Sequence, residues 1–121
     1  MASEDLENEI QNYALSFNMR RDFVSVVCGA EYSNSRKCNK SGLLILENEL
    51  YVKLKDKLLS YGKLGEKVNT TSIGCCAEVN ASNDIYIKHV INLNEIVLSR
   101  AYRPKTMQVR DKCQICKDIF Y

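Results

Sequence analysis

The sequence predicts an α/β domain in which a small mixed β-sheet is flanked by helices. Two segments, 3–18 and 43–59, have apolar residues at helical spacing. Two others, 22–32 and 96–102, favour strands, and 96–102 lies between two helix-like segments. A strand between helices is typical of layered α/β architectures, and 121 residues suit a single domain.

The first half of the chain predicts a helix, a strand, a turn-forming stretch and a second helix. In 3–18 apolar residues recur every three or four positions, and Ser3 is placed to cap the N-terminus. The segment 22–32 is rich in β-branched and aromatic residues, which predicts a strand. The polar stretch 33–42 is turn-forming, with room for a short hairpin. Residues 43–59 have an apolar residue every three or four positions, which predicts a helix that glycines follow.

The second half predicts two helices that each begin at a cysteine, with a strand between them. Such helices favour thiolate chemistry, because the helix dipole stabilises negative charge at the N-terminus. In chain order the elements are a loop over 66–74, a helix from Cys75 or Cys76 to about Lys88, a strand over 96–102 that Pro104 interrupts and 107–109 resume, and a short helix over 113–121.

Composition and charge exclude several classes of protein. No apolar run reaches membrane-spanning length, and the acidic, polar N-terminus is unlike a signal peptide. The net charge of +2 gives no argument for nucleic-acid binding by itself. From Lys88 onward, however, seven Lys or Arg residues stand against three acids. The C-terminal third is therefore basic, which favours an anionic partner.

The six cysteines are not spaced as a simple disulfide framework. Cys75 and Cys76 are adjacent, and Cys113 and Cys116 form a C-x-x-C pair. In a small secreted domain an even number of cysteines indicates bridges, whereas in a reducing compartment the same residues indicate a metal. The residues around the cysteines decide between these interpretations.

Three of the cysteines can supply the protein ligands of a catalytic zinc ion, a site that leaves one position open to water. Cys113 and Cys116 are three positions apart, so on one helical turn both thiolates point the same way. Cys76 begins the other cysteine-led helix. Glu78 follows two residues later; it is not needed as a ligand and is placed to act as general acid and base.

The remaining cysteines and the histidine have ordinary interpretations. Cys75 is expected to be a small buried residue or a bystander, and Cys28 is expected in the core of its strand. Cys38 is expected either to be a free thiol or to pair with Cys28 across a hairpin. His89, the only histidine, is expected at the end of a helix with no part in the metal site.

The two cysteine motifs resemble the signature of the zinc nucleobase deaminases, in which [H/C]-x-E is followed by P-C-x-x-C. Here they are Cys-Ala-Glu at 76–78 and Cys-Gln-Ile-Cys at 113–116, with 36 residues between the first and second ligand cysteines. With Gly-Cys-Cys-Ala-Glu-Val-Asn at 74–80 and Arg-Ala-Tyr-Arg-Pro-Lys at 100–105, the chain is most similar to the YwqJ-like branch of the cytidine deaminase superfamily, over roughly residues 70–121.

The chain departs from the family pattern at two places. Lys112 stands where the motif has proline, which leaves all three ligands in place. The chain also ends five residues after Cys116, so we expect the later strands of the family sheet to be absent or reduced.

The resemblance implies a deaminase-like fold with Zn²⁺ at two helix N-termini and hydrolytic deamination of a nucleobase, with cytosine favoured. It also implies a toxin effector domain of a longer, secreted bacterial protein, delivered to a target cell and acting in its cytoplasm. A cognate immunity protein is the implied inhibitor. The expected substrate is single-stranded DNA or RNA, because a target base must leave its stack. No membrane partner is expected.

Three residues are candidates for substrate contact. Asn80 faces the site if it continues the helix beyond Glu78, and a solvent-facing or capping role is the alternative. Tyr102 lies between Arg100 and Arg103, and interleaved aromatic and basic residues can stack a base and hold phosphate. The alternative for this stretch is a strand with alternating, solvated charge.

Two other functions stay open at this point. The chain is alternatively a non-catalytic interaction module in which a fourth cysteine, Cys28 or Cys38, closes a structural zinc site and Glu78 is incidental. The third interpretation is a secreted binding domain held together by disulfides.

Overall fold

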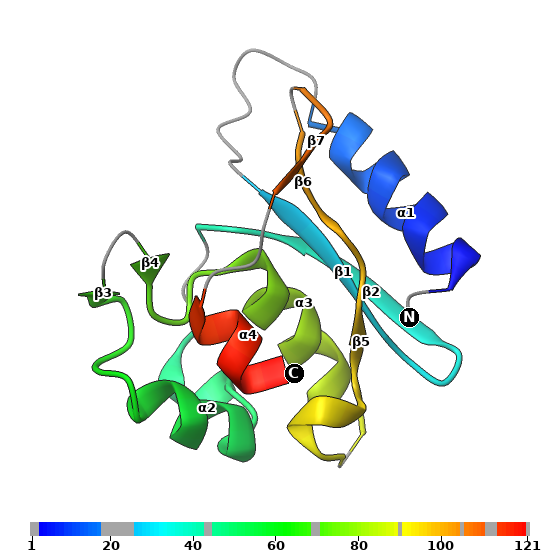
Figure 1. Cartoon of the computed structure of the whole chain (residues 1–121). Coiled ribbons are helices and arrows are strands. Elements are labelled where there is room, and N and C mark those ends of the chain that lie inside the picture. Colours follow the sequence, from blue (N-terminus) through cyan, green and yellow to red (C-terminus); the bar gives the residue numbers. More distant parts are fainter. Residues whose placement is uncertain are drawn as a thin grey trace.

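The computed structural model is an antiparallel sheet with α1 on one face and the other helices on the opposite face (Figure 1). This confirms the α/β class. The structure describes residues 3–17, 26–42, 45–68, 71–89, 91–104, 106–110 and 114–120. Within these ranges no helix has the length and apolar character that a bilayer crossing needs.

The elements alternate along the chain much as their sequence patterns predict. Short 3₁₀ turns, η1 and η2, precede α2 and β5. In chain order the elements are α1 (Glu4–Leu15), β1 (Val27–Tyr32), β2 (Ser35–Lys40), η1 (Glu47–Glu49), α2 (Val52–Leu59), β3 (Lys67–Val68), β4 (Thr71–Ser72), α3 (Ala77–Tyr86), η2 (Leu93–Glu95), β5 (Val97–Leu98), β6 (Ala101–Arg103), β7 (Gln108–Arg110) and α4 (Gln114–Phe120).

The main sheet has five strands in the order β2-β1-β6-β7, and β5 pairs with β1 beside β6. Every pairing is antiparallel, so the expectation of a mixed sheet is wrong. The expectation that 107–109 resume the strand over 96–102 is also wrong, because β7 folds back on β6 as a hairpin. β3 and β4 form a separate two-stranded hairpin inside the segment predicted as a loop.

The direction of α3 explains why the sheet is antiparallel. At its start, the Asn80 side chain donates to the carbonyl of Lys40, the last residue of β2. Just beyond its end, His89 contacts Ser35, the first residue of β2. The helix therefore carries the chain to the turn end of the β1–β2 hairpin. β5 starts there, opposite Glu31, and β6 follows it to the other end of β1, opposite Val27, so both strands run antiparallel to β1.

Successive residues of β1 face opposite sides of the sheet, as strand geometry requires. Val27 packs with Ile10 and Ala14 of α1, whereas Cys28 and Ala30 belong to the core cluster that contains α3. The sheet therefore has an α1 face and an α3 face, and the register of β1 with β2 assigns the residues of β2 to the same two faces.

The predicted N-terminal helix and its cap are confirmed. Ser3 Oγ accepts from the backbone N–H of Leu6 and also donates to Glu31 at 2.6 Å, which ties the start of α1 to β1. The predicted strand over 22–32 is confirmed from residue 27; residues 22–25 lie outside the described ranges. The short hairpin expected in 33–42 is β1–β2.

The helix predicted over 43–59 is wrong in its first part, since only 52–59 is α-helical. Asn83 of α3 accepts from the N–H of Tyr51 and donates to the carbonyl of Glu49. These bonds take the backbone groups that a continuous helix would use, so tertiary contact overrides the periodic pattern. Leu43 and Leu44 lie outside the described residues.

Leu6 of α1 packs directly on Gly29 of β1, where an added Cβ would lie 2.8 Å from Leu6 Cδ1. Gly29→Ala should lower the free energy of unfolding by about 1–3 kcal/mol, because Leu6 is fully buried and has little room to move. Denaturant unfolding measures the effect. In the Leu6→Ala background the added methyl group should cost little, and an equal cost in both backgrounds would contradict this packing.

Candidate functional site

The start of α3 is held against the end of the β1–β2 hairpin. The backbone N–H of Gly42 donates to the carbonyl of Cys75 at 2.9 Å. Gly74 has a φ of 84°, which suits glycine and lets the chain turn sharply into the helix. Cys76 is the N-cap residue, with extended backbone at φ −70° and ψ 147°. The predicted cysteine-led helix is thereby confirmed, with Cys76 rather than Cys75 at the capping position.

Glu78 lies in the first turn of α3 and is only 4% exposed. A carboxylate is stabilised at a helix N-terminus by the dipole, but burial of a charge is costly unless partners offset it. Buried carboxylates also occur in catalytic sites, so Glu78 remains a candidate residue.

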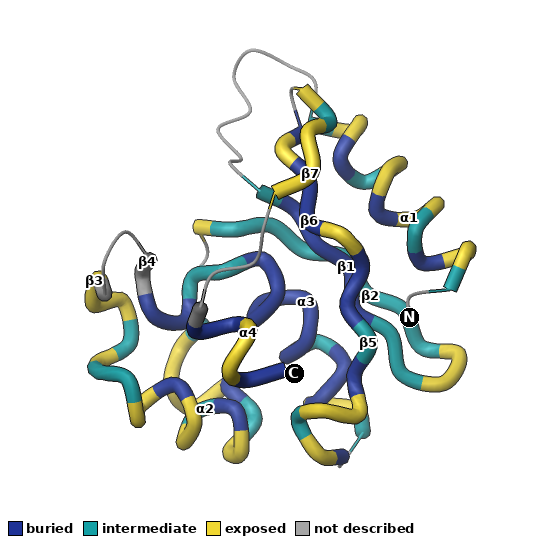
Figure 2. Tube along the Cα trace, in the orientation of Figure 1, coloured by how far each residue is buried: buried dark blue, intermediate teal, exposed yellow. Residues whose placement is uncertain are grey.

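Cys116 lies in the first turn of α4 and is fully buried. It belongs to the same core cluster as Ala77 and Val79 of α3, and Cys76 packs against that cluster. Figure 2 shows the buried turns of α3 and α4 next to each other. The structure therefore brings the beginnings of two cysteine-led helices, Cys76 and Cys116, into one core.

Cys113 directly precedes α4 in the sequence and lies outside the described residues. Within the described ranges no group of three or more His, Cys, Asp or Glu side chains is placed to hold a metal. Cys76 and Cys116 fit thiolate ligands in their chemistry and their position, since both lie at helix N-termini, where a thiolate is stabilised.

The other cysteines differ from Cys76 in position. Burial raises the pKa of the Cys75 thiol, which favours its neutral form. Cys38 lies opposite Gly29 on the α1 face, whereas Cys28 faces α3, so these two thiols do not form the disulfide considered above. Burial first, and then the charge of Glu9, raise the pKa of Cys38 to about 11. Cys38 is therefore a neutral thiol on the face away from Cys116.

Asn80, predicted to contact substrate, is fully buried, and its Nδ2 donates to the Lys40 carbonyl at 2.8 Å. The bond joins the first turns of α3 to the end of β2. A role in holding the helix in place is therefore evident in the geometry, in addition to any contact with substrate.

Tyr102 and Arg103 lie on opposite faces of β6. Tyr102 is 6% exposed and packs with Val27 in the α1-face cluster, and its hydroxyl lies 3.4 Å from Glu7 of α1. The structure thus does not bring Tyr102 to Glu78. Arg103, the next residue, is exposed, and strand alternation places it on the α3 face. Arg110 pairs with Ala101 and so shares that face.

Sequence reasoning missed two residues near this site. Ser82 follows Glu78 by one helical turn and is fully buried, and among the described residues its hydroxyl has no hydrogen-bond partner. The four-residue spacing of Glu78 and Ser82 could have indicated that both side chains lie on the same face of the helix. Arg110 joins Arg103 only through the β6–β7 pairing, which the sequence pattern did not predict.

Comparisons of the chain with protein-family models, curated proteins and solved structures find no match. The resemblance to zinc deaminases therefore rests on the two cysteine motifs of the sequence.

Asn80→Ala should lower the free energy of unfolding by about 1–3 kcal/mol, because it removes the hydrogen bond from the fully buried Asn80 side chain to the Lys40 carbonyl. Thermal unfolding measures the loss. Asn39→Ala, which removes the bonds of a partly buried side chain to Asp84 and to the Lys40 N–H, is the control and should cost less. Equal stability of wild type and Asn80→Ala would contradict the structural role.

Proposed function

We propose that this chain is a zinc-dependent hydrolytic deaminase of nucleobases, acting on cytosine in single-stranded nucleic acid. The supporting observation is that Cys76 and Cys116 lie at the starts of two helices that share one core, with Glu78 buried one turn into the first. Cys76, Cys113 and Cys116 are the proposed ligands.

A zinc ion held by three protein ligands lowers the pKa of water at its open position and so supplies a nucleophile at neutral pH. Glu78 takes a proton from the attacking water and passes it to the departing amine, so that the C–N bond breaks and ammonia leaves. Its burial supports this role, because a carboxylate shielded from bulk water exchanges protons with the substrate rather than with solvent.

Two exposed arginines support a nucleic-acid substrate. Arg103 and Arg110 lie on the face of β6 and β7 that carries α3, and β7 precedes α4 in the chain. Phosphate contacts from Arg and Lys supply most non-specific affinity for nucleic acid. Because Tyr102 is buried against α1, we assign base stacking to no aromatic residue here and give the contact role to Arg103.

The competing function is a non-catalytic module with a structural four-cysteine zinc site. Of the two isolated cysteines, only Cys28 shares the core cluster of Cys116, whereas Cys38 lies on the other face of the sheet. A four-cysteine site would therefore need Cys28 or Cys75. In that case Glu78 has no chemical role.

The resemblance also supports a biological setting as part of the proposal. The domain acts as a bacterial toxin effector in the cytoplasm of a target cell, and a cognate immunity protein blocks it. Co-expression with a neighbouring small gene product that restores growth would support this setting.

Glu78→Ala should reduce deamination by about 10²–10⁴-fold while one zinc ion per chain and the fold are retained. Activity is measured by sequencing DNA and RNA from expressing cells, and metal content by elemental analysis. Cys116→Ser is the contrasting variant: it should release zinc and destabilise the chain, because metal binding is coupled to folding. Loss of zinc from Glu78→Ala would make Glu78 a ligand, and retained activity would remove it from the reaction.

Arg103→Ala should weaken deamination of single-stranded polymer more than that of free cytidine, because only the polymer offers backbone phosphates to the exposed guanidinium. Lys57→Ala, which removes an exposed charge from α2, is the control and should change neither rate. Rates at matched base concentration and increasing salt measure the effect. A salt-independent reaction that prefers free cytidine would contradict the polymer assignment.

A further inference from the structure

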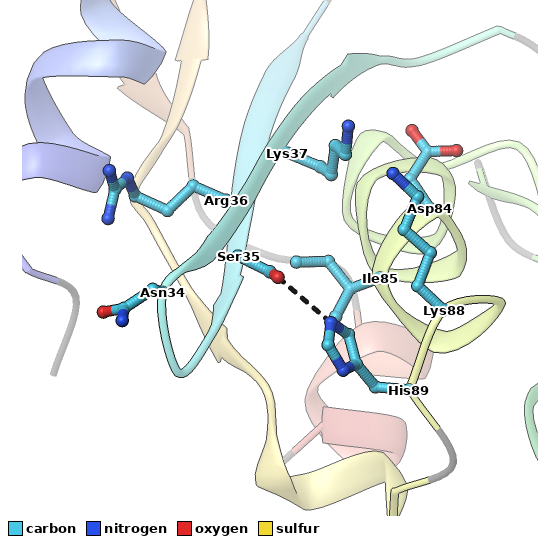
Figure 3. A pocket seen from close by; sticks show the side chains of 8 residues that line it. All are labelled: Asn34, Ser35, Arg36, Lys37, Asp84, Ile85, Lys88 and His89. Carbon is cyan, nitrogen blue, oxygen red and sulfur yellow. Dashed lines mark hydrogen bonds between the residues drawn. The ribbon is translucent and has the colours of Figure 1, made fainter.

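A pocket of about 250 Å³ lies at the C-terminal end of α3, between that helix and the turn of the β1–β2 hairpin. Ser35 and Lys37 line it from β2, and Lys88 and His89 line it from the residues that follow α3 (Figure 3). The helical rise from Cys76 to Asp84, the lining residue of α3 nearest to it in the sequence, is about 12 Å, so the pocket is not part of the candidate zinc site.

Lysine side chains outnumber carboxylates in the lining of this pocket. Lys37 and Lys88 form no ion pair within the described ranges. Arg36 is turned to the α1 face, as Figure 3 shows, and is neutralised there by Glu9 and Glu31. The acid that lines the pocket, Asp84, accepts a hydrogen bond from Asn39 at 3.1 Å. The Asn39 amide is neutral, so Asp84 keeps its negative charge, and the two lysines leave one positive charge in excess.

A hydrogen-bonded pair forms the wall of the pocket. Ser35 Oγ lies 3.0 Å from His89 Nε2, and the Tyr32 ring packs against the imidazole with 5.3 Å between centroids. When Nε2 donates to Ser35 Oγ, the hydroxyl proton is left to bond an anion. No described carboxylate bonds the imidazole, which argues against a nucleophilic triad.

We infer that this pocket binds a phosphate group through Lys37, Lys88 and the Ser35 hydroxyl. Lys side chains and hydroxyls are the usual protein partners of nucleic-acid phosphates. The favoured source is the backbone of the strand whose target base lies at the start of α3, and this choice of source rests on the proposed function. A strand that crosses the α3 face would contact both ends of the helix.

The test uses the single histidine as a reporter. The His89 ring signals in an NMR spectrum should shift and saturate when the Glu78→Ala protein is titrated with inorganic phosphate. In Lys37→Ala/Lys88→Ala the shift should be lost, and in the charge-matched control Lys57→Ala/Lys63→Ala it should persist. Absence of a saturable shift in the unmodified pocket would overturn the site.

Titration with cytidine monophosphate and with a single-stranded oligonucleotide distinguishes the sources. For a strand, the slope of log affinity against log salt should become less steep by about 1.4 in the double lysine variant, two contacts at about 0.7 each. An unchanged slope, with binding of the mononucleotide alone, would overturn the strand as the source. Binding is measured without turnover, so it is independent of activity. If the wild-type protein deaminates no substrate but the pocket still binds strands, the deaminase proposal is wrong and the phosphate site is retained.

Discussion

The packing of α3 across the β1–β2 hairpin is the constraint on which the rest of the structure depends. The helix is fastened at its start, where Asn80 bonds the Lys40 carbonyl, and beyond its end, where His89 meets Ser35. Its direction forces β5 and β6 to run against β1, and it places Glu78 at one end of the hairpin and the basic pocket at the other. Both proposed sites are thus consequences of one helix laid on one sheet.

The sequence of α3 is unusual for such a central helix, because its buried residues include Glu78, Asn80, Ser82 and Asn83. Buried polar groups are costly unless they are hydrogen-bonded. Asn80 and Asn83 form hydrogen bonds to the backbone of neighbouring segments. These bonds offset the cost of burying the two amides and fix the position of α3. Glu78 is buried in the first turn of the same helix, where the positive end of the helix dipole favours a carboxylate.

Local patterns in the sequence predicted the elements well where neighbours in the chain decide them. The cap at Ser3, the helix that begins at Cys76 and the terminal helix after Cys113 all follow from short-range rules. The helix predicted over 43–59 failed because Asn83, remote in sequence, takes backbone groups at Glu49 and Tyr51.

Long-range pairing decided the rest. The hairpin of β6 and β7, the burial of Tyr102 against α1 and the meeting of Ser35 with His89 all depend on which strands and helices pack together. None of these contacts has a periodicity or motif in the sequence. For the same reason the candidate site was predicted from its motifs, Cys76 and Glu78 included, whereas the faces on which its substrate residues lie were not.

X-ray absorption at the zinc edge of the purified chain tests the central claim most directly. The account predicts one zinc with three sulfur ligands at about 2.3 Å and one oxygen ligand; four sulfur ligands, or a reduced protein without zinc, would contradict it.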